Sequence, residues 1–119
     1  MLPWKILLLD DDPASAQQRR LILGMHGFEV ETAADIREAA EKRRQSPYDL
    51  ILVELRHDAD SALEFCEEVK QTDPNQRFAL MTPFYSRVNS DCPDDIIFKD
   101  GPRQMVDRVR RLIETAPAD

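Results

Sequence analysis

Five side chains that could take part in phosphate or metal chemistry end or directly follow short apolar runs. They are Asp10, Asp11, Glu54, Thr82 and Lys99. Carboxylates that converge repel one another unless a cation, raised pKa values or a basic partner stabilises them, and oxygen ligands of this kind suit Mg²⁺. A hydroxyl and an ammonium group nearby can hold an anionic oxygen. Together these groups would form a phosphoryl-transfer site, provided that the fold brings them to one place.

The apolar runs in front of these residues predict buried strands. Most of their positions are apolar without alternation, which is typical of a strand covered on both faces. Such strands are predicted at residues 6–9, 50–53, 78–81 and 96–98. A strand near a sheet edge is predicted at residues 28–31, because apolar and acidic residues alternate there.

Helices are predicted between these strands by the spacing of apolar residues. Asp12 followed by Pro13 is a strong helix start, since Asp12 can cap the free amides and proline suits the first helical position. The predicted helices cover residues 13–25, 35–45, about 61–71 and 102 or 103 to 115. Residues 55–60 are predicted to form a loop, and prolines interrupt any long helix in residues 83–95.

Strands and helices therefore alternate along one domain that spans residues 1–119. This alternation predicts an α/β fold with right-handed crossovers and a parallel sheet covered by helices on both faces. In such sheets the functional crevice lies beyond the carboxyl ends of the strands, where the strand order reverses. We therefore expect the five side chains to meet at that rim.

Composition and charge narrow the class of protein. The chain is 42% hydrophobic and 33% charged, and it has no apolar segment near the roughly 20 residues that span a bilayer. Its beginning lacks the features of a signal peptide, so a cytoplasmic protein without membrane contact is predicted. A net charge of −7 argues against direct binding to nucleic acid.

The two cysteines, Cys66 and Cys92, are predicted to be plain thiols. They lie far apart in the sequence without metal-ligand spacing, and a disulfide is disfavoured in a reducing compartment. Cys66 falls on the apolar face of its predicted helix, as expected of a small buried residue.

The ordered set of motifs resembles the receiver domain of two-component response regulators, of the CheY-like type. The motifs are Leu8-Leu9-Asp10-Asp11-Asp12-Pro13, the run 49–54, Leu80-Met81-Thr82 and Phe98-Lys99. The resemblance implies a flavodoxin-like, doubly wound sheet of five parallel strands in the order 2-1-3-4-5. It also implies that Asp10, Asp11 and Glu54 are the metal-binding acids, that Thr82 and Lys99 are the switch residues, and that Glu54 stands at the phospho-acceptor position.

The sequence departs from this family at the position that matters most. Family members carry aspartate where this chain has Glu54, and the extra methylene moves the carboxylate by more than about 1 Å, which can cost a hundredfold in rate. Ile96 replaces the aromatic switch residue, and Asp100 replaces the proline after the lysine. The stretch between Thr82 and Lys99 is short by roughly one helical turn, so a shortened or lost fourth helix is expected.

The leading hypothesis is a divergent pseudo-receiver that is not an enzyme and acts through protein-protein interaction. Glu54 would supply one permanent negative charge where a phosphoryl group supplies nearly two. Asp10 and Asp11 either keep affinity for Mg²⁺ or are idle, and the hypothesis requires no cofactor. Thr82 and Lys99 are either switch residues or an ordinary strand-end hydroxyl and a solvated lysine.

The alternative is an active phosphoacceptor that takes a phosphoryl group with Mg²⁺ from a histidine kinase. A flavin or nucleotide binder is disfavoured because three acids stand where a phosphate-binding loop would be. The expected partners are a regulatory protein, a histidine kinase or a second copy of the chain. We expect the docking surface at the last helix, where arginines lie beside exposed apolar candidates: Arg103, Arg108, Arg110, Arg111, Phe84, Tyr85 and Val88. The alternative is that these arginines form an ordinary solvated helix face.

Overall fold

Five parallel strands form one sheet in a computed structural model of the chain, which describes residues 3–54, 59–82, 91–98 and 101–115. The strands are β1 (Lys5–Asp10), β2 (Glu29–Ala33), β3 (Leu50–Glu54), β4 (Phe78–Thr82) and β5 (Asp95–Phe98). Their order in the sheet is β2-β1-β3-β4-β5, so the chain reverses direction across the sheet between β1 and β3. The predicted fold class and strand order are confirmed.

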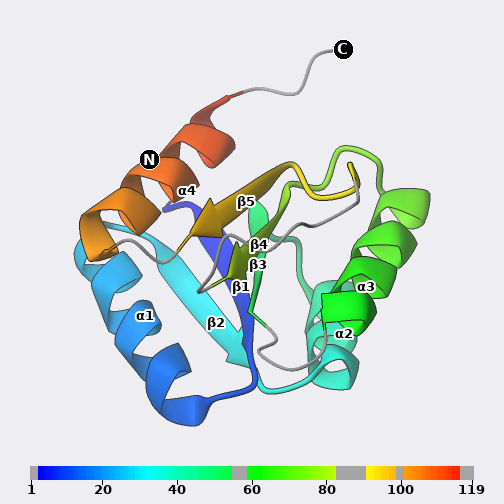
Figure 1. The fold of residues 1–119 in the computed structure, drawn as a ribbon, viewed down its shortest axis with the longest axis horizontal. Helices are drawn as coiled ribbons and strands as arrows, with labels where there is room; N and C mark the ends of the chain where they lie inside the picture. The colour runs from blue at the N-terminus through cyan, green and yellow to red at the C-terminus, as the bar shows by residue number, and fades with distance from the viewer. Residues whose placement is uncertain (1–2, 55–58, 83–90, 99–100, 116–119) are drawn as a thin grey trace.

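Four helices are assigned within the described residues, and they cover both faces of the sheet. They are α1 (Pro13–Met25), α2 (Ile36–Gln45), α3 (Ala59–Thr72) and α4 (Pro102–Glu114). Helices α1 and α4 lie on one face, and α2 and α3 lie on the other (Figure 1). None of these helices is both long and apolar enough to cross a bilayer.

The unbroken apolar runs are explained by this two-sided cover. In β1, Ile6 and Leu8 pack in the core under α1 and α4, whereas Leu7 and Leu9 pack in the core under α2 and α3. All four side chains are 0% exposed. Successive side chains of a strand point to opposite faces, so a strand between two helical layers needs apolar residues at every position.

Helix boundaries follow the capping residues. Asp12 is the N-cap of α1, and its Oδ1 accepts the N–H of Ala14 at 3.2 Å. Asp35 caps α2 by accepting the N–H of Glu38 at 2.8 Å. These side chains satisfy amides that have no partner within the helix. The predicted starts of both helices therefore agree with the structure to within one residue.

Two predicted boundaries are wrong. Strand β2 ends at Ala33 rather than residue 31, and α3 begins at Ala59, so the predicted loop 55–60 is too long. The earlier helix start is favourable because alanine is the best helix former and Asp60 places a negative charge in the first turn. The predicted change in the fourth family helix falls mainly on residues 83–90, which lie outside the described residues; residues 91–94 are not helical.

Candidate functional site

Asp10 and Glu54 lie side by side at the carboxyl ends of neighbouring strands. The register of β1 against β3 pairs Asp10 with Glu54. Both residues are almost fully buried, with exposed fractions of 2% for Asp10 and 1% for Glu54. The structure thus brings together two of the predicted site acids, and burial makes their charges costly without compensation.

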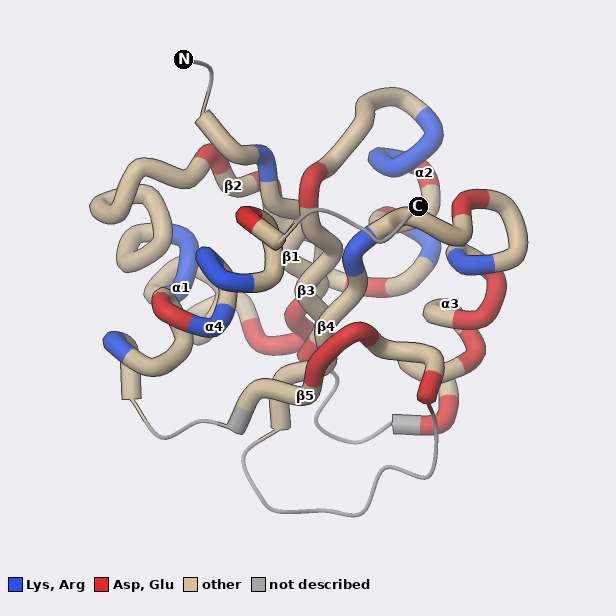
Figure 2. The backbone as a smooth tube through the Cα atoms, turned by 90° about the horizontal axis from the view of Figure 1, so that it is seen from above, with Lys and Arg blue, Asp and Glu red and all other residues tan. Residues whose placement is uncertain are grey.

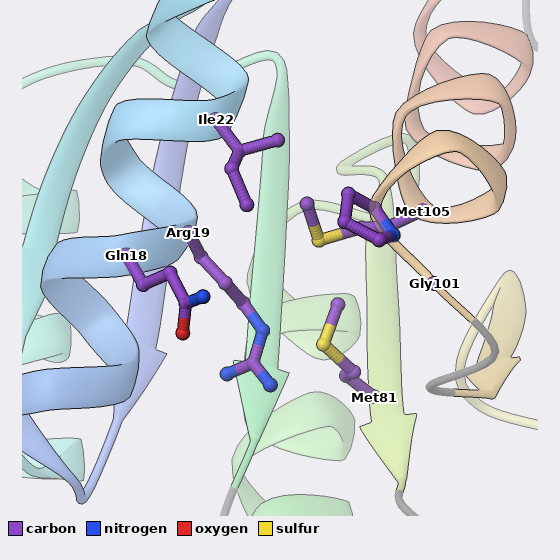
Figure 3. Close-up of a pocket in the computed structure, with 7 residues that line it drawn as sticks. Gln18, Arg19, Ile22, Met81, Gly101 and Met105 are labelled. Atoms are coloured by element: carbon purple, nitrogen blue, oxygen red, sulfur yellow. The ribbon is translucent and has the colours of Figure 1, made fainter.

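Arg19 of α1 neutralises part of this charge. Its Nη1 atom donates to Asp10 Oδ2 at 2.7 Å and also forms an ion pair with Glu54 Oε2. The arginine side chain is only 12% exposed. Figure 3 shows it extending from α1 toward the carboxyl end of β3. One guanidinium nitrogen therefore bridges the two buried carboxylates, and ion pairs in this setting are little screened by water or salt.

Local hydrogen bonds hold each member of this cluster in place. Asp10 Oδ1 accepts the backbone N–H of Asp12 at 2.9 Å, so both oxygens of this carboxylate are engaged. Arg19 Nη1 also contacts Ser15 Oγ, one helical turn earlier, at 2.7 Å. The start of α1 therefore fixes the acid and the base with respect to each other.

The sequence reasoning missed Arg19, although the chain carries a signal for it. Ala16 and Leu23 are the buried residues of α1, and Arg19 falls between them at the i, i+3, i+7 spacing of a core-facing stripe. A charged residue in such a stripe needs a buried partner. The next residue, Arg20, is exposed, so Arg19 faces the core and Arg20 faces the solvent.

A cavity of about 170 Å³ lies between α1 and α4, next to Arg19. Ile22, Met81 and Met105 form much of its wall (Figure 3). Gln18 and Arg19 are the polar side chains that line it. The cavity thus borders the arginine that pairs with the two acids.

The other three predicted site residues are placed differently. Asp11 is exposed, so its side chain is not packed into the buried cluster. Thr82 ends β4 at the same edge of the sheet and is half-buried. Lys99 lies outside the described residues. The predicted switch roles of Thr82 and Lys99 remain predictions.

The geometry bears on whether Mg²⁺ fits this site. Mg²⁺ binds carboxylate oxygens at about 2.0–2.1 Å, and an ion held by Asp10 Oδ2 and Glu54 Oε2 would stand against the Arg19 guanidinium, which has the same sign of charge. With Arg19 in this place the residues do not fit the ion. Within the described residues, moreover, no three His, Cys, Asp or Glu side chains form a metal-binding group. Coordination by Asp10, Asp11 and Glu54 remains a prediction that requires Arg19 to move.

The arginines expected on a docking surface are partly engaged within the molecule. Arg108 pairs with Asp95, with its Nε donating to Oδ2 at 2.8 Å, and this raises the pKa of Arg108. Arg110 donates to the carbonyl of His26 and lies over the ring of Phe28. Arg103 and Arg111 are exposed, whereas Phe84, Tyr85 and Val88 lie outside the described residues. The docking surface at α4 remains a prediction.

Solved structures of receiver proteins are similar to this chain. The response regulator TrrA from Thermotoga maritima, in complex with Mg²⁺ and BeF, aligns with a TM-score of 0.82 at 25% identity, covering 92% of this chain and 98% of that one. A CheY-like receiver domain protein from Methanospirillum hungatei aligns with a TM-score of 0.82 at 26% identity, covering 94% of each chain.

Curated relatives are longer than this chain. ResD, a transcriptional regulatory protein of Bacillus subtilis, is 29% identical over 94% of this chain and 49% of its own length. MtrA, a DNA-binding response regulator of Mycolicibacterium smegmatis, is 27% identical over 97% of this chain and 54% of its own length. PilR of Pseudomonas aeruginosa is 28% identical over 69% of this chain and 18% of its own length. The chain thus spans at most about half of these relatives.

The family profile of the response regulator receiver domain matches residues 6–110, which is most of the chain. Apart from the first residue of β1, the matched region includes all five strands and the acids Asp10 and Glu54 at their carboxyl ends. The sequence match, the strand order and the structural likeness agree, and the chain belongs to the response regulator receiver domain family of two-component signalling.

Proposed function

We propose that this receiver domain is a signalling module that acts through protein-protein interaction without a cycle of phosphorylation. The observation that carries the proposal is the ion pair of Arg19 with Glu54 and Asp10. A nucleophilic carboxylate needs an oxygen that the phosphodonor can reach. Glu54 is 1% exposed, and one of its oxygens pairs with an arginine of the same chain.

Two features of Glu54 disfavour its phosphorylation. Its carboxylate stands more than about 1 Å further from the backbone than that of an aspartate, and errors of this size can reduce a rate a hundredfold. Its pairing with Arg19 stabilises the negative charge in place. The result is a fixed internal ion pair at the position where the family carries a reversible charge.

This role requires no Mg²⁺. In the family the cation neutralises acids at the carboxyl ends of the strands, and here Arg19 supplies a positive charge to two of them. A guanidinium is always protonated at physiological pH, so the neutralisation does not depend on metal concentration. We expect a state of the domain that is insensitive to both phosphodonor and divalent cation.

The partner is proposed to be a regulatory protein, a histidine kinase or a second copy of this chain. The names of the relatives ResD, MtrA and PilR, which describe regulators, support a place in signal transduction. Arginine positions outnumber acidic ones along α4, whereas Asp and Glu positions predominate along α3 (Figure 2). The exposed Arg103 and Arg111 of α4 suit a partner with acidic side chains.

Exposure to acetyl phosphate and Mg²⁺, followed by intact-mass measurement, tests the proposal. The wild-type protein is expected to gain no phosphoryl group. Glu54→Asp alone is expected to remain a poor acceptor, and Glu54→Asp combined with Arg19→Gln is expected to accept best, because the acid is then both the right length and unblocked. Glu54→Asp combined with Arg20→Gln is the matched control and is expected to resemble Glu54→Asp.

A labile, Mg²⁺-dependent phosphoryl adduct on the wild-type chain would overturn the proposal and establish an active phosphoacceptor. Calorimetric titration with Mg²⁺ gives a second readout. Wild-type protein is expected to show weaker binding than Arg19→Gln, since removal of the guanidinium frees carboxylate oxygens for the metal. Equal affinity of the two proteins would contradict the role of Arg19 as a substitute cation.

A further inference from the structure

The two cysteine thiols lie in contact although 26 positions separate them in the sequence. Cys66 belongs to α3 and is fully buried, and Cys92 precedes β5 and is half-buried. Their Sγ atoms are 2.6 Å apart, and neither cysteine is in a disulfide. The chain contains no other cysteine, so each thiol has one possible intramolecular partner.

Hydrogen bonds around Asp94 hold Cys92 in this position. The backbone N–H of Asp94 donates to the carbonyl of Phe78 at 2.7 Å, and Asp94 Oδ2 accepts the N–H of Phe78 at 2.8 Å. Lys70 Nζ, on the helix of Cys66, donates to the same Oδ2 at 2.7 Å. The segment that carries Cys92 is thus tied both to β4 and to α3, so its backbone is held beside the helix of Cys66.

We propose that Cys66 and Cys92 form a reversible disulfide and that the pair is a site of exchange with small disulfides such as glutathione disulfide. The site is independent of Glu54 and of the proposed function. The neighbouring sulfurs need only a small side-chain shift to reach bonding geometry, and the surrounding backbone already holds both residues. Oxidation would link α3 covalently to the start of β5.

The exchange proceeds in two steps in which atoms and electrons balance. The Cys92 thiolate attacks one sulfur of glutathione disulfide, an S–S bond to glutathione forms, and one glutathione thiolate leaves. Cys66 then attacks the Cys92 sulfur and displaces the second glutathione, which takes up the proton that Cys66 loses. Two protein thiols are oxidised by two electrons, and one glutathione disulfide is reduced to two glutathione molecules.

Exposure decides the order of the two steps. Cys92 is the thiol that solvent can reach, whereas Cys66 is enclosed by the core under α2 and α3. Burial, followed by the contact with Cys92, raises the pKa of Cys66, so this thiol is protonated near neutral pH. Cys66 therefore suits the resolving step, in which it reacts with a sulfur already held beside it.

The experiment exposes the full chain to excess glutathione disulfide, quenches with acid, alkylates the remaining thiols and measures the intact mass. The wild-type chain is expected to lose two hydrogens, take up no alkyl group and carry no glutathione. It is expected to remain a monomer on a non-reducing gel. Its melting temperature should rise by about 10 °C and fall again on reduction, because the link constrains the unfolded chain.

Two variants assign the steps. Cys66→Ala is expected to stop at a stable glutathione adduct on Cys92, because the resolving thiol is absent. Cys92→Ala is expected to keep an unmodified Cys66, because that thiol is buried. Circular dichroism of both variants checks that they fold.

Several results would overturn the proposal. They are a wild-type chain that retains two alkylatable thiols, one that stops at a glutathione adduct, and one that links to a second chain instead of forming an internal bond. An internal bond without a higher melting temperature would equally count against it, since the native arrangement of the two thiols would then not suit a disulfide.

Discussion

The two edges of the sheet carry similar ion pairs in different surroundings. At the carboxyl edge, the side chains of Asp10, Glu54 and Arg19 are between 0 and 12% exposed. At the amino edge, Lys70 and Asp94 pair at 2.7 Å, but their side chains are 21% and 26% exposed. The chemical groups are alike, and the difference between the edges is access to water.

This difference separates two uses of charge. A half-exposed pair contributes little net stability, so Asp94 matters mainly through the backbone hydrogen bonds that it makes to Phe78. A buried cluster is costly to form and more costly to break, because removal of one partner leaves an isolated charge in the core. The stability of the carboxyl edge therefore depends strongly on Arg19, although this side chain is not a reactive group.

The largest expected effect is that of Arg19→Met. This change leaves two buried carboxylates without their bridging cation and is expected to lower the free energy of unfolding by about 3–5 kcal/mol. Arg20→Met is the matched control, because the next residue along the helix is exposed, and it is expected to change stability by less than about 0.5 kcal/mol. Urea unfolding of both variants measures the difference. Equal stabilities would show that the buried ion pair of Arg19 contributes no more to stability than an exposed arginine does.

A smaller effect is expected at the amino edge from Asp94→Ala. The N–H of Phe78 loses its acceptor and Lys70 loses its partner, which should cost about 1–2 kcal/mol. Asp91→Ala is the control, since Asp91 is exposed and belongs to the same segment. If urea unfolding showed a larger loss for Asp94→Ala than for Arg19→Met, burial would not be the factor that distinguishes the two edges.

The smallest effect is expected from Tyr48 at alkaline pH. Burial, followed by the hydrogen bond to Glu31, raises the pKa of Tyr48 above its ordinary value of 10.0. The unfolded chain then releases this proton at lower pH than the folded chain does, so the contribution is present below about pH 10 and is lost as the pH rises above it. Between pH 9 and pH 10.5 the loss should be roughly 0.8 kcal/mol at most.

Urea unfolding at the two pH values measures this loss, with Tyr48→Phe as the control. Phenylalanine has no proton to release, so the variant should lack this part of the decrease in stability. An identical decrease in both proteins would show that Tyr48 titrates normally in the folded chain.

The elements of the fold could be predicted because their signals are local. A strand covered on two faces requires consecutive apolar residues, and a helix start requires a cap. The burial of Leu7 and Leu8 and the capping role of Asp12 could therefore be predicted from the residues next to them in the sequence. The meeting of Asp10 and Glu54 could also be predicted, since the carboxyl ends of parallel strands share one edge. The start of α3 at Ala59 lies two residues before the predicted start at about residue 61.

The contacts that decide the chemistry could not be predicted in the same way. Arg19 is separated from Glu54 by 35 positions, and Cys66 from Cys92 by 26, so nothing local joins them. Arg108 and Arg110 looked like surface residues for the same reason, since their partners Asp95 and His26 lie on other elements. Each of these contacts forms only because the helices pack against the sheet in a particular position.

Periodicity and capping are therefore sufficient to predict the alternation of strands and helices and a carboxylate at the carboxyl end of β3, because both follow from residues close together in the chain. The strand order was predicted from the resemblance to the receiver family. Packing of α1 against the sheet decided that an arginine pairs with that carboxylate, and packing of α3 against the start of β5 decided that two thiols touch. Ion pairs and sulfur contacts depend on distances of a few ångströms between separate elements, and only the tertiary structure sets those distances.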